Sequence, residues 1–346
     1  MELLSEYGLF LLQTLTVVFA VLFVFAVSSK FSGSDDPKGS IRVTDLSKSY
    51  AEQKDYVATE IKSALPGPKK SLLQRIKQRF RKRDNPVGTD TEVEKKLAVV
   101  LEFKGDMKAS QVSALREEVS AVLAMDRTPD CVLIKLTSPG GLVHTYGLAG
   151  SQLSRFKDVG IELVACVDTV AASGGYMMAV CADRIISAPF AILGSIGVVA
   201  QIPNINRFLK NRDVDVELHT AGTNKRTLTV LGENTPEGRK KFKEDLTQTH
   251  DLFKAWVAAR RPNLDIDSLA DGSIFYGTDA LEKGLCDQIA TSDDVLMQMN
   301  QEYHLISLKW HQKKSLAARL GRDASEAVSD QIDAFIHRSN QDFTRL

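Results

Sequence analysis

The sequence predicts an α/β fold built on a mainly parallel sheet. Between residues 97 and 181, short apolar runs typical of buried strands alternate with longer segments whose apolar residues recur at helical spacing. Strands that alternate with helices imply right-handed crossover connections, which place neighbouring strands parallel. The 346 residues are 43% hydrophobic, which is enough for one good core with appendages. We therefore expect one principal domain.

The predicted elements follow one another along the chain. Strands are expected at Leu97–Phe103, Cys131–Leu136 and Ile161–Val167, and helices at Ser110–Met125, Val143–Phe156 and Tyr176–Cys181. Further on, the pattern predicts a strand at Val214–His219, a helix from Thr235 to just before Pro262, a strand at Tyr303–Trp310 and a helix at Leu316–Arg338. The long helix is expected to bury one stripe of side chains, namely Phe242, Leu246, Leu252, Phe253, Trp256 and Val257.

The chain divides into four predicted segments. Residues 1–29 form a membrane anchor, and residues 30–95 form a polar, basic linker with helical pieces. Residues 96–295 are the expected catalytic domain. Residues 296–346 add a strand and a mixed-charge helix that we expect to serve in oligomer contacts.

The amino-terminal segment predicts a retained transmembrane helix. No charged residue occurs from Tyr7 to Ser29, and Leu9–Val27 is nearly all apolar, close to the ~20 residues that span a bilayer. A cleaved signal peptide is the alternative, but no Lys or Arg precedes the apolar run. The first basic residues follow the span, and this charge bias alone would place the body in the cytoplasm.

A basic stretch within the linker has two interpretations. Lys69–Arg83 holds eight basic residues and no acidic one, with Leu72, Leu73, Ile76 and Phe80 on one helical face. Such a helix could lie on anionic lipid, and a solvated helix or spacer is equally compatible. A role in nucleic-acid binding is not expected, because aromatic residues are not interleaved with the charges.

Composition narrows the chemistry further. Lys and Arg together number 44, as do Asp and Glu, so net charge does not favour a nucleic-acid partner. The four cysteines form no C-x-x-C pair, and we expect small buried hydrophobic residues rather than a zinc site or disulfides: Cys131, Cys166, Cys181 and Cys286.

The strongest chemical signal is Ser173 in the stretch Ala171–Ala179. Two glycines follow this serine, at a point where a predicted strand gives way to a helix. Gly140 and Gly141 lie at the end of another predicted strand, so they are expected at the same edge of the sheet. A serine nucleophile needs donors for an oxyanion, and the N–H groups of this loop and of Gly174 are candidates.

A serine nucleophile also needs a base, and the sequence offers two. His144 can line the cleft, but no motif pairs it with an acidic residue. Lys225 is the better candidate, provided that its surroundings lower its pKa from ~10.4, and the hydroxyl of Ser195 could orient it. Taken alone, Lys225 could also belong to an ordinary basic loop.

Four motifs in order resemble one family. Ser-Pro-Gly-Gly at 138–141, Ala-Ser-Gly-Gly-Tyr-Met-Met-Ala at 172–179, Gly-Ser-Ile-Gly-Val at 194–198 and Ala-Gly-Thr-Asn-Lys at 221–225 are similar to the half-length signal peptide peptidase A family of serine-lysine proteases. The resemblance spans Leu97–Ile289 and includes Asp271–Leu281. One departure is Thr137, where the family usually has Asn.

The resemblance implies a Clp/crotonase-type fold with neither metal nor cofactor. Ser173 would be the nucleophile, Lys225 the general base and then acid, and Ser195 the residue that holds the lysine. Gly141 and Gly174 would form the oxyanion hole, and Gly140 and His144 would contact substrate. Family members are ring-like homo-oligomers with sites near subunit boundaries, and the catalytic domain would face the periplasm from the bacterial inner membrane.

The prediction is therefore a membrane-anchored serine endopeptidase that cleaves unfolded or signal-peptide-derived segments through an acyl-enzyme. One alternative is an acyl-CoA hydratase or thioesterase on the same fold, which needs no serine at position 173 and usually carries a pocket Glu or Asp. Another is a non-catalytic membrane scaffold that recruits partners through residues 30–95 and the tail.

The uncharged stretch Ile185–Asn206 could be mistaken for a second membrane span. It contains Pro189, Gly194, Gly197 and Pro203, which favour buried strand and loop. We expect this stretch to carry Ser195 into the site.

Overall fold

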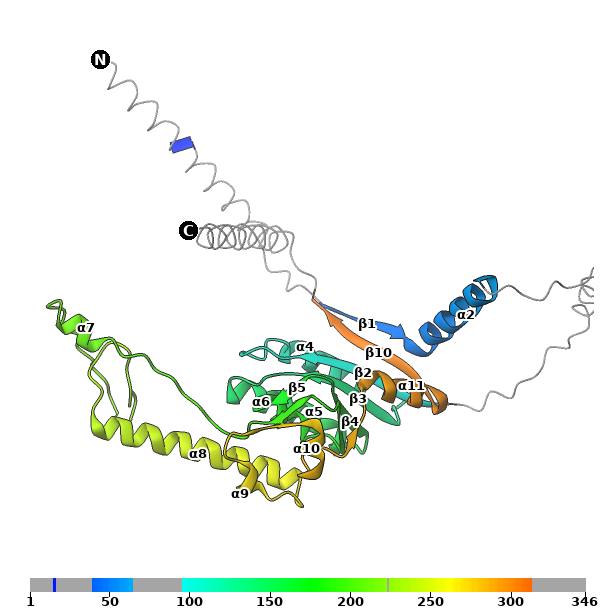
Figure 1. Cartoon of the computed structure of the whole chain (residues 1–346). Coiled ribbons are helices and arrows are strands. Elements are labelled where there is room, and N and C mark those ends of the chain that lie inside the picture. Colours follow the sequence, from blue (N-terminus) through cyan, green and yellow to red (C-terminus); the bar gives the residue numbers. More distant parts are fainter. Residues whose placement is uncertain (1–14, 17–38, 65–94, 223, 313–346) are drawn as a thin grey trace, which may run out of the picture. The chain divides into compact units, whose positions relative to one another are not determined.

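The computed structural model describes residues 15–16, 39–64, 95–222 and 224–312 (Figure 1). The basic segment Lys69–Arg83, the helix expected at Leu316–Arg338 and all but two residues of the expected anchor Leu9–Val27 lie outside these ranges. Within them, no helix has both the length and the hydropathy to cross a bilayer. The chain divides into two units, residues 1–40 with 310–346 and residues 41–309, and the second unit contains nearly all of the described elements.

A seven-stranded sheet forms the centre of this second unit. Its strand order is β1-β10-β2-β3-β4-β6-β9. The pairs from β10 through β9 are all parallel. The strands are β1 (Ser40–Asp45), β10 (Tyr303–His311), β2 (Lys96–Lys104), β3 (Cys131–Thr137), β4 (Glu162–Val167), β6 (Arg184–Ser187) and β9 (Gln288–Ile289).

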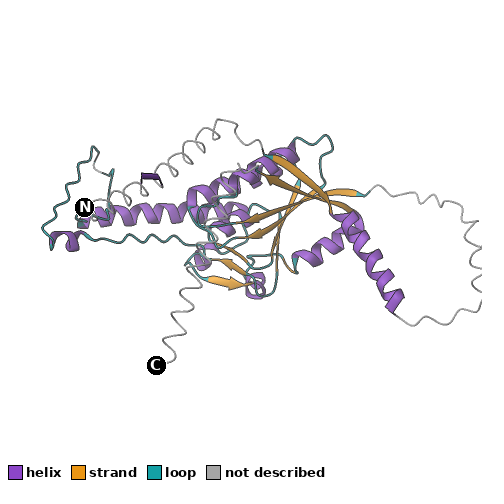
Figure 2. Cartoon of the chain, turned by 90° about the horizontal axis from the view of Figure 1, so that it is seen from above, coloured by secondary structure: helices purple, strands orange, loops and turns teal. Residues whose placement is uncertain are grey.

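Side chains of the central strands alternate between two apolar cores, as the two-residue period of a strand requires. In β3, Val132 and Ile134 face one core and Cys131 and Leu133 face the other. The first core is covered by α4 (Val112–Leu123), α5 (Val143–Asp158), α6 (Gly174–Ala179) and the end of α8 (Pro236–Arg260), and the second by α2 (Leu46–Ala64) and α11 (Ser292–Glu302). Helices thus lie on both sides of the strands (Figure 2), which confirms the α/β fold with a mainly parallel sheet.

A smaller sheet continues from the carboxyl end of β3. It consists of β5 (Val170–Ala172), β7 (Ile192–Gly194) and β8 (Ile274–Tyr276), with β5 and β7 parallel and β8 antiparallel to β7. A single bridge between Ser138 and Ala171 joins the two sheets. The first part of the uncharged stretch Ile185–Asn206 contributes to β6 and β7 and is largely buried, as predicted, whereas residues 199–205 are exposed, so the prediction of buried strand and loop is only partly correct. Short helices complete the fold: α7 (Asn206–Lys210), α9 (Ile266–Leu269) and α10 (Gly277–Glu282).

Residues 198–235, here called the arm, connect β7 to α8 and carry α7 (Figure 1). The strand predicted at Val214–His219 is wrong, because these residues are largely exposed and pair with no neighbouring strand. The arm is instead held by side-chain amides: Asn204 Nδ2 donates to the Thr229 carbonyl at 2.8 Å, and Asn206 Nδ2 donates to the Leu231 carbonyl at 2.8 Å.

Helix α8 begins and ends where the sequence predicted. The Thr235 hydroxyl accepts a hydrogen bond from the Gly238 N–H at 3.0 Å, with Pro236 in the first turn. The predicted buried stripe is only partly correct, because Phe253 and Val257 are buried whereas Leu252 is 67% exposed. Only the end of the helix packs on the core, since its first turns adjoin the arm.

The amino-terminal boundary of the folded body also differs from the prediction. Residues 40–64 were expected as part of a linker with helical pieces; α2 fits the helical pieces, whereas β1 was not expected and is the edge strand of the main sheet. The side chains of β1 are mostly exposed, so no apolar run marks this strand in the sequence.

Candidate active site

Ser173 occupies a strained turn between β5 and α6. Its φ of 52° and ψ of −118° lie outside the regions that non-glycine residues prefer, which costs about 1–3 kcal/mol. The turn is held on both sides: the Ser173 N–H donates to the Gly194 carbonyl at 2.8 Å, and its carbonyl accepts from the Met177 N–H at 2.9 Å. A sharp strand-to-helix turn of this kind exposes the serine Oγ to a substrate.

Ser195 lies beside Ser173, on the neighbouring strand. Because β5 and β7 are parallel and pair Ala172 with Gly194, the two serines follow directly at the carboxyl ends of adjacent strands. Ser195 also has a positive φ, of 51°, and its N–H donates to the Ser273 carbonyl at 2.7 Å. The structure thus places the two serines next to each other, while the predicted role of Ser195 in orienting Lys225 stays a prediction.

The loop after β3 lies directly against the nucleophile candidate. Gly140 has a φ of +89°, and a Cβ added there would lie 2.7 Å from both the Gly174 nitrogen and the Ser173 Cβ. A Cβ on Gly141 would collide with the Met107 carbonyl oxygen. Both glycines are therefore required by close approach of backbone to backbone.

Two amide N–H groups, one directly after Ser173 and one in the loop that lies against it, have no acceptor among the described residues. The Gly140 N–H is not one of them, because it donates to the Ser138 hydroxyl at 3.1 Å. In the described part of the chain, the Gly141 N–H has no acceptor, and the Gly174 N–H is the first of helix α6, where no intrahelical acceptor exists. This arrangement can stabilise the oxyanion of a tetrahedral intermediate.

The structure adds Tyr146 and Asp106, which sequence reasoning missed. The Tyr146 hydroxyl lies 2.6 Å from the Ser138 hydroxyl and donates to the Asp106 carbonyl at 2.7 Å. Burial raises the pKa of Tyr146, so its hydroxyl keeps its proton. The only signal in the sequence was a tyrosine on the predicted helix that follows the two glycines.

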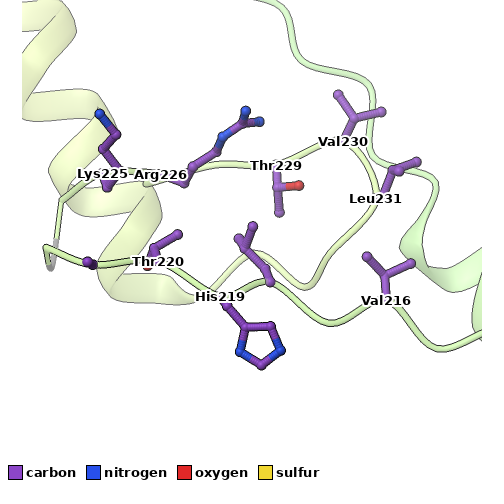
Figure 3. A pocket seen from close by; sticks show the side chains of 10 residues that line it. Val216, His219, Thr220, Lys225, Arg226, Thr229, Val230 and Leu231 are labelled. Atoms are coloured by element: carbon purple, nitrogen blue, oxygen red, sulfur yellow. The ribbon is translucent and has the colours of Figure 1, made fainter.

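Lys225 lies on the arm, away from contact with either serine. Its side chain is exposed, and it lines one end of a hollow formed entirely by arm residues (Figure 3). The lining residues are Val216, Leu218, His219, Thr220, Ala221, Lys225, Arg226, Thr229, Val230 and Leu231. The structure therefore gathers Ser173, Ser195 and the glycines but does not bring Lys225 to them within one chain.

The structure also locates His144 and the four cysteines named in the sequence analysis. His144 is exposed in the first turn of α5, and its contact with substrate stays a prediction. The four cysteines are buried and free, as expected of small hydrophobic residues, and burial raises the pKa of Cys131 and of Cys166 to about 12. Among the described residues, no group of three or more His, Cys, Asp or Glu side chains is placed to hold a metal ion.

Comparisons with known proteins define the class. Residues 155–305 match peptidase family S49, and residues 2–153 match its N-terminal region. The chain is 45% identical to the probable protease SohB of Haemophilus influenzae, over 99% of both chains, and 51% identical to the probable protease SohB of Buchnera aphidicola from Acyrthosiphon pisum, over 69% of this chain and 71% of the relative. Among solved structures, the 1510-N membrane-bound stomatin-specific protease, as a lysine mutant with a substrate peptide, is 12% identical, with a TM-score of 0.41 and coverage of 68% of this chain and 100% of that one.

These findings make the chain a peptidase of α/β architecture. It belongs to peptidase family S49, and its sequence resembles SohB proteases over its whole length. The peptidase prediction is thereby favoured over the acyl-CoA and scaffold alternatives. The Clp/crotonase type of the fold stays a prediction.

Proposed function

We propose that the chain is a membrane-anchored serine endopeptidase. Ser173 Oγ attacks the carbonyl carbon of a peptide bond, the amine departs, and water then hydrolyses the resulting ester on Ser173. The observation that carries the proposal is the strained Ser173 turn, with the unbonded N–H of Gly174 next in the chain and that of Gly141 in the loop whose Gly140 lies against Ser173. These two donors would hold the negative oxygen that forms during both steps.

Lys225 is the proposed general base. It takes the Ser173 proton during attack and gives it to the departing amine, while the adjacent Ser195 hydroxyl orients the lysine. A lysine acts as a base only where burial or nearby cations favour its neutral form. The Lys225 side chain is exposed on the arm, so the burial has to come from a surface beyond its own surroundings.

We propose that this surface belongs to a second copy of the chain. The arm exposes large apolar side chains, with Val199 at 92% and Phe208 at 60%, a pattern that favours a protein contact. In a ring-like homo-oligomer with head-to-tail contacts, the arm of one copy would bring its Lys225 to Ser173 and Ser195 of the next.

The substrates and the membrane attachment follow from the sequence. The proposed substrates are unfolded or signal-peptide-derived segments, as the resemblance to the signal peptide peptidase A family implies. The anchor is Leu9–Val27, with the catalytic domain on the periplasmic side of a bacterial inner membrane as the family resemblance implies, against the bias of the flanking charges.

The test is hydrolysis of a fluorogenic unfolded protein by the full-length chain in detergent. Ser173→Ala and Lys225→Ala should each lower kcat/KM by at least about 1,000-fold. Two controls should retain activity. Ser151→Ala removes a hydroxyl of α5 that bonds only the Gly147 carbonyl, and Lys210→Ala removes an arm lysine paired with Glu233. More than a tenth of wild-type activity in either test variant, with normal thermal unfolding, refutes the dyad.

A further inference from the structure

A chain of hydrogen bonds runs from the glycine loop into the core, and its direction is fixed. The Tyr146 hydroxyl donates to the Asp106 carbonyl, which can only accept. Tyr146 therefore accepts from the Ser138 hydroxyl at 2.6 Å, and Ser138 in turn accepts from the Gly140 N–H at 3.1 Å. In this hydrogen-bonded series of Gly140, Ser138, Tyr146 and Asp106, each of the two hydroxyl groups donates one hydrogen bond and accepts one.

The two hydroxyl groups in the middle of this hydrogen-bonded series are buried, and the series ends at Asp106, an exposed residue of the turn after β2. Ser138 and Tyr146 are fully buried. The Asp106 backbone is held by the turn that follows it, because the Asp106 carboxylate accepts from the Ser110 hydroxyl at 2.6 Å and from the Ser110 N–H at 2.8 Å. These bonds close the turn that presents the Asp106 carbonyl to the Tyr146 hydroxyl, so the loop of Gly140 is linked through Ser138 and Tyr146 to that turn.

The peptide that carries the Gly141 N–H lies between two anchored peptides. On one side the Gly140 N–H is held by Ser138, and on the other the Leu142 N–H donates to the Met107 carbonyl at 2.9 Å. The orientation of the intervening N–H is therefore set by its neighbours. Tyr146 also touches the second donor, since a Cβ on Gly174 would collide with the Tyr146 ring.

We infer that Tyr146 is a positioning residue for the oxyanion site, acting through Ser138 on the loop of Gly140 and Gly141 and through its ring on Gly174. The inference rests on the proposed function. The buried hydroxyl of Tyr146 does not contact the substrate. Removal of this hydroxyl nevertheless lets the Gly141 N–H turn away from the reacting carbonyl.

The test compares two buried tyrosines in the full-length protein. Tyr146→Phe should lower kcat about tenfold or more while KM stays within twofold, because the oxyanion forms only after binding. Tyr176→Phe is the matched control: Tyr176 is equally buried, but its hydroxyl donates only to the Leu285 carbonyl, at 3.0 Å. Its kcat should be unchanged.

A pair of inhibitors separates positioning from a general structural effect. A peptide aldehyde forms a tetrahedral adduct whose oxygen uses the oxyanion donors, whereas the corresponding peptide amide binds without forming one. Tyr146→Phe should raise Ki for the aldehyde by the same factor as it lowers kcat, and leave Ki for the amide unchanged. Equal shifts for both inhibitors overturn the inference.

Two further measurements keep the inference testable if Tyr146→Phe is poorly stable. Ser138→Ala should reproduce its kinetic loss, and the double variant should lose no more than the larger single loss, because both act through one hydrogen bond. If the kinetic losses of the two single variants add in the double variant, Tyr146 and Ser138 do not act through one hydrogen bond, and the inference is contradicted.

Amide hydrogen exchange of residues 138–142 provides a readout that does not depend on activity. Tyr146→Phe should accelerate exchange there, and Tyr176→Phe should not. Unchanged exchange refutes the inference whatever the activity. Accelerated exchange in a protein whose wild type cleaves no peptide refutes the proposed function and leaves the hydrogen-bond chain standing.

Discussion

The sheet that carries Ser173 and the arm that carries Lys225 are built in different ways. Around Ser173, backbone contacts on all sides leave no room even for a Cβ at Gly140. Along the arm, side-chain amides hold the backbone and large apolar groups face solvent. The comparison teaches that one chain brings together the serines and amide donors of the proposed site, while the proposed base, Lys225, lies on an exposed arm away from them.

The sheet and the arm are also expected to contribute differently to the stability of the fold and to oligomer assembly. The cores on both faces of the main sheet are apolar and closely packed, so they dominate the free energy of unfolding. The arm buries little by comparison. Substitutions in the two regions should therefore fail in different ways, and the following variants break or sharpen the contrast.

The largest effect is expected at Gly140. In Gly140→Ala the new methyl would lie 2.7 Å from the Gly174 nitrogen and would occupy the approach to that donor, in a backbone with φ of +89°. We expect kcat for peptide hydrolysis to fall about 100-fold or more. The control is Gly147→Ala in α5, where an added Cβ meets nothing within 4 Å. Full activity in Gly140→Ala would show that the loop does not serve the reaction.

Two phenylalanines should separate stability from assembly. Phe156 is fully buried in the first core, and Phe156→Ala should lower the free energy of unfolding by about 3–5 kcal/mol. Phe208 is 60% exposed on the arm, and Phe208→Ala should cost less than about 1 kcal/mol but reduce oligomer formation and activity. Denaturant titration and sedimentation measure the two effects. If Phe208→Ala assembles like the wild type, the arm does not form the oligomer interface.

The smallest expected effect concerns Asp106. Hydrogen bonds from Ser110 hold the pKa of this carboxyl below its ordinary value of 3.8. A lowered pKa in the folded state means that the carboxylate stabilises the protein above the ordinary value, and that this contribution is lost as pH falls through the folded value.

Comparing denaturation at pH 5 and pH 3 tests the sign of this effect. The wild type should lose more stability between the two conditions than Asp106→Asn, which has no carboxyl to protonate at this position. Equal losses in both proteins would mean that the turn after β2 does not depend on the carboxylate.

Much of the fold could be predicted because the central strands are buried on both faces. Such strands appear as continuous apolar runs, which is why β2, β3 and β4 were found within a residue or two. Their parallel order then implied that Gly140 and Ser173 meet at one edge. The edge strand β1 was missed because its exposed side chains carry no such run.

The site was predicted less completely, for a different physical reason. The roles of glycine and serine follow from backbone geometry that local motifs encode. The contacts of Tyr146 with Ser138 and Asp106 depend on hydroxyl direction across three segments, which residue periodicity does not reveal. The position of Lys225 depends on the arm, where the predicted strand does not form and where the residue is exposed and lines a hollow made of other arm residues.

The most direct test of the central claim is to mix two inactive variants. Ser173→Ala keeps the lysine and Lys225→Ala keeps the serine, so a mixed oligomer with sites shared between copies would contain intact pairs. Co-assembly at equal amounts should restore about one quarter of wild-type peptide hydrolysis, because that fraction of interfaces joins the right two copies. No restored activity in demonstrably mixed oligomers would contradict the account and place serine and base within one chain.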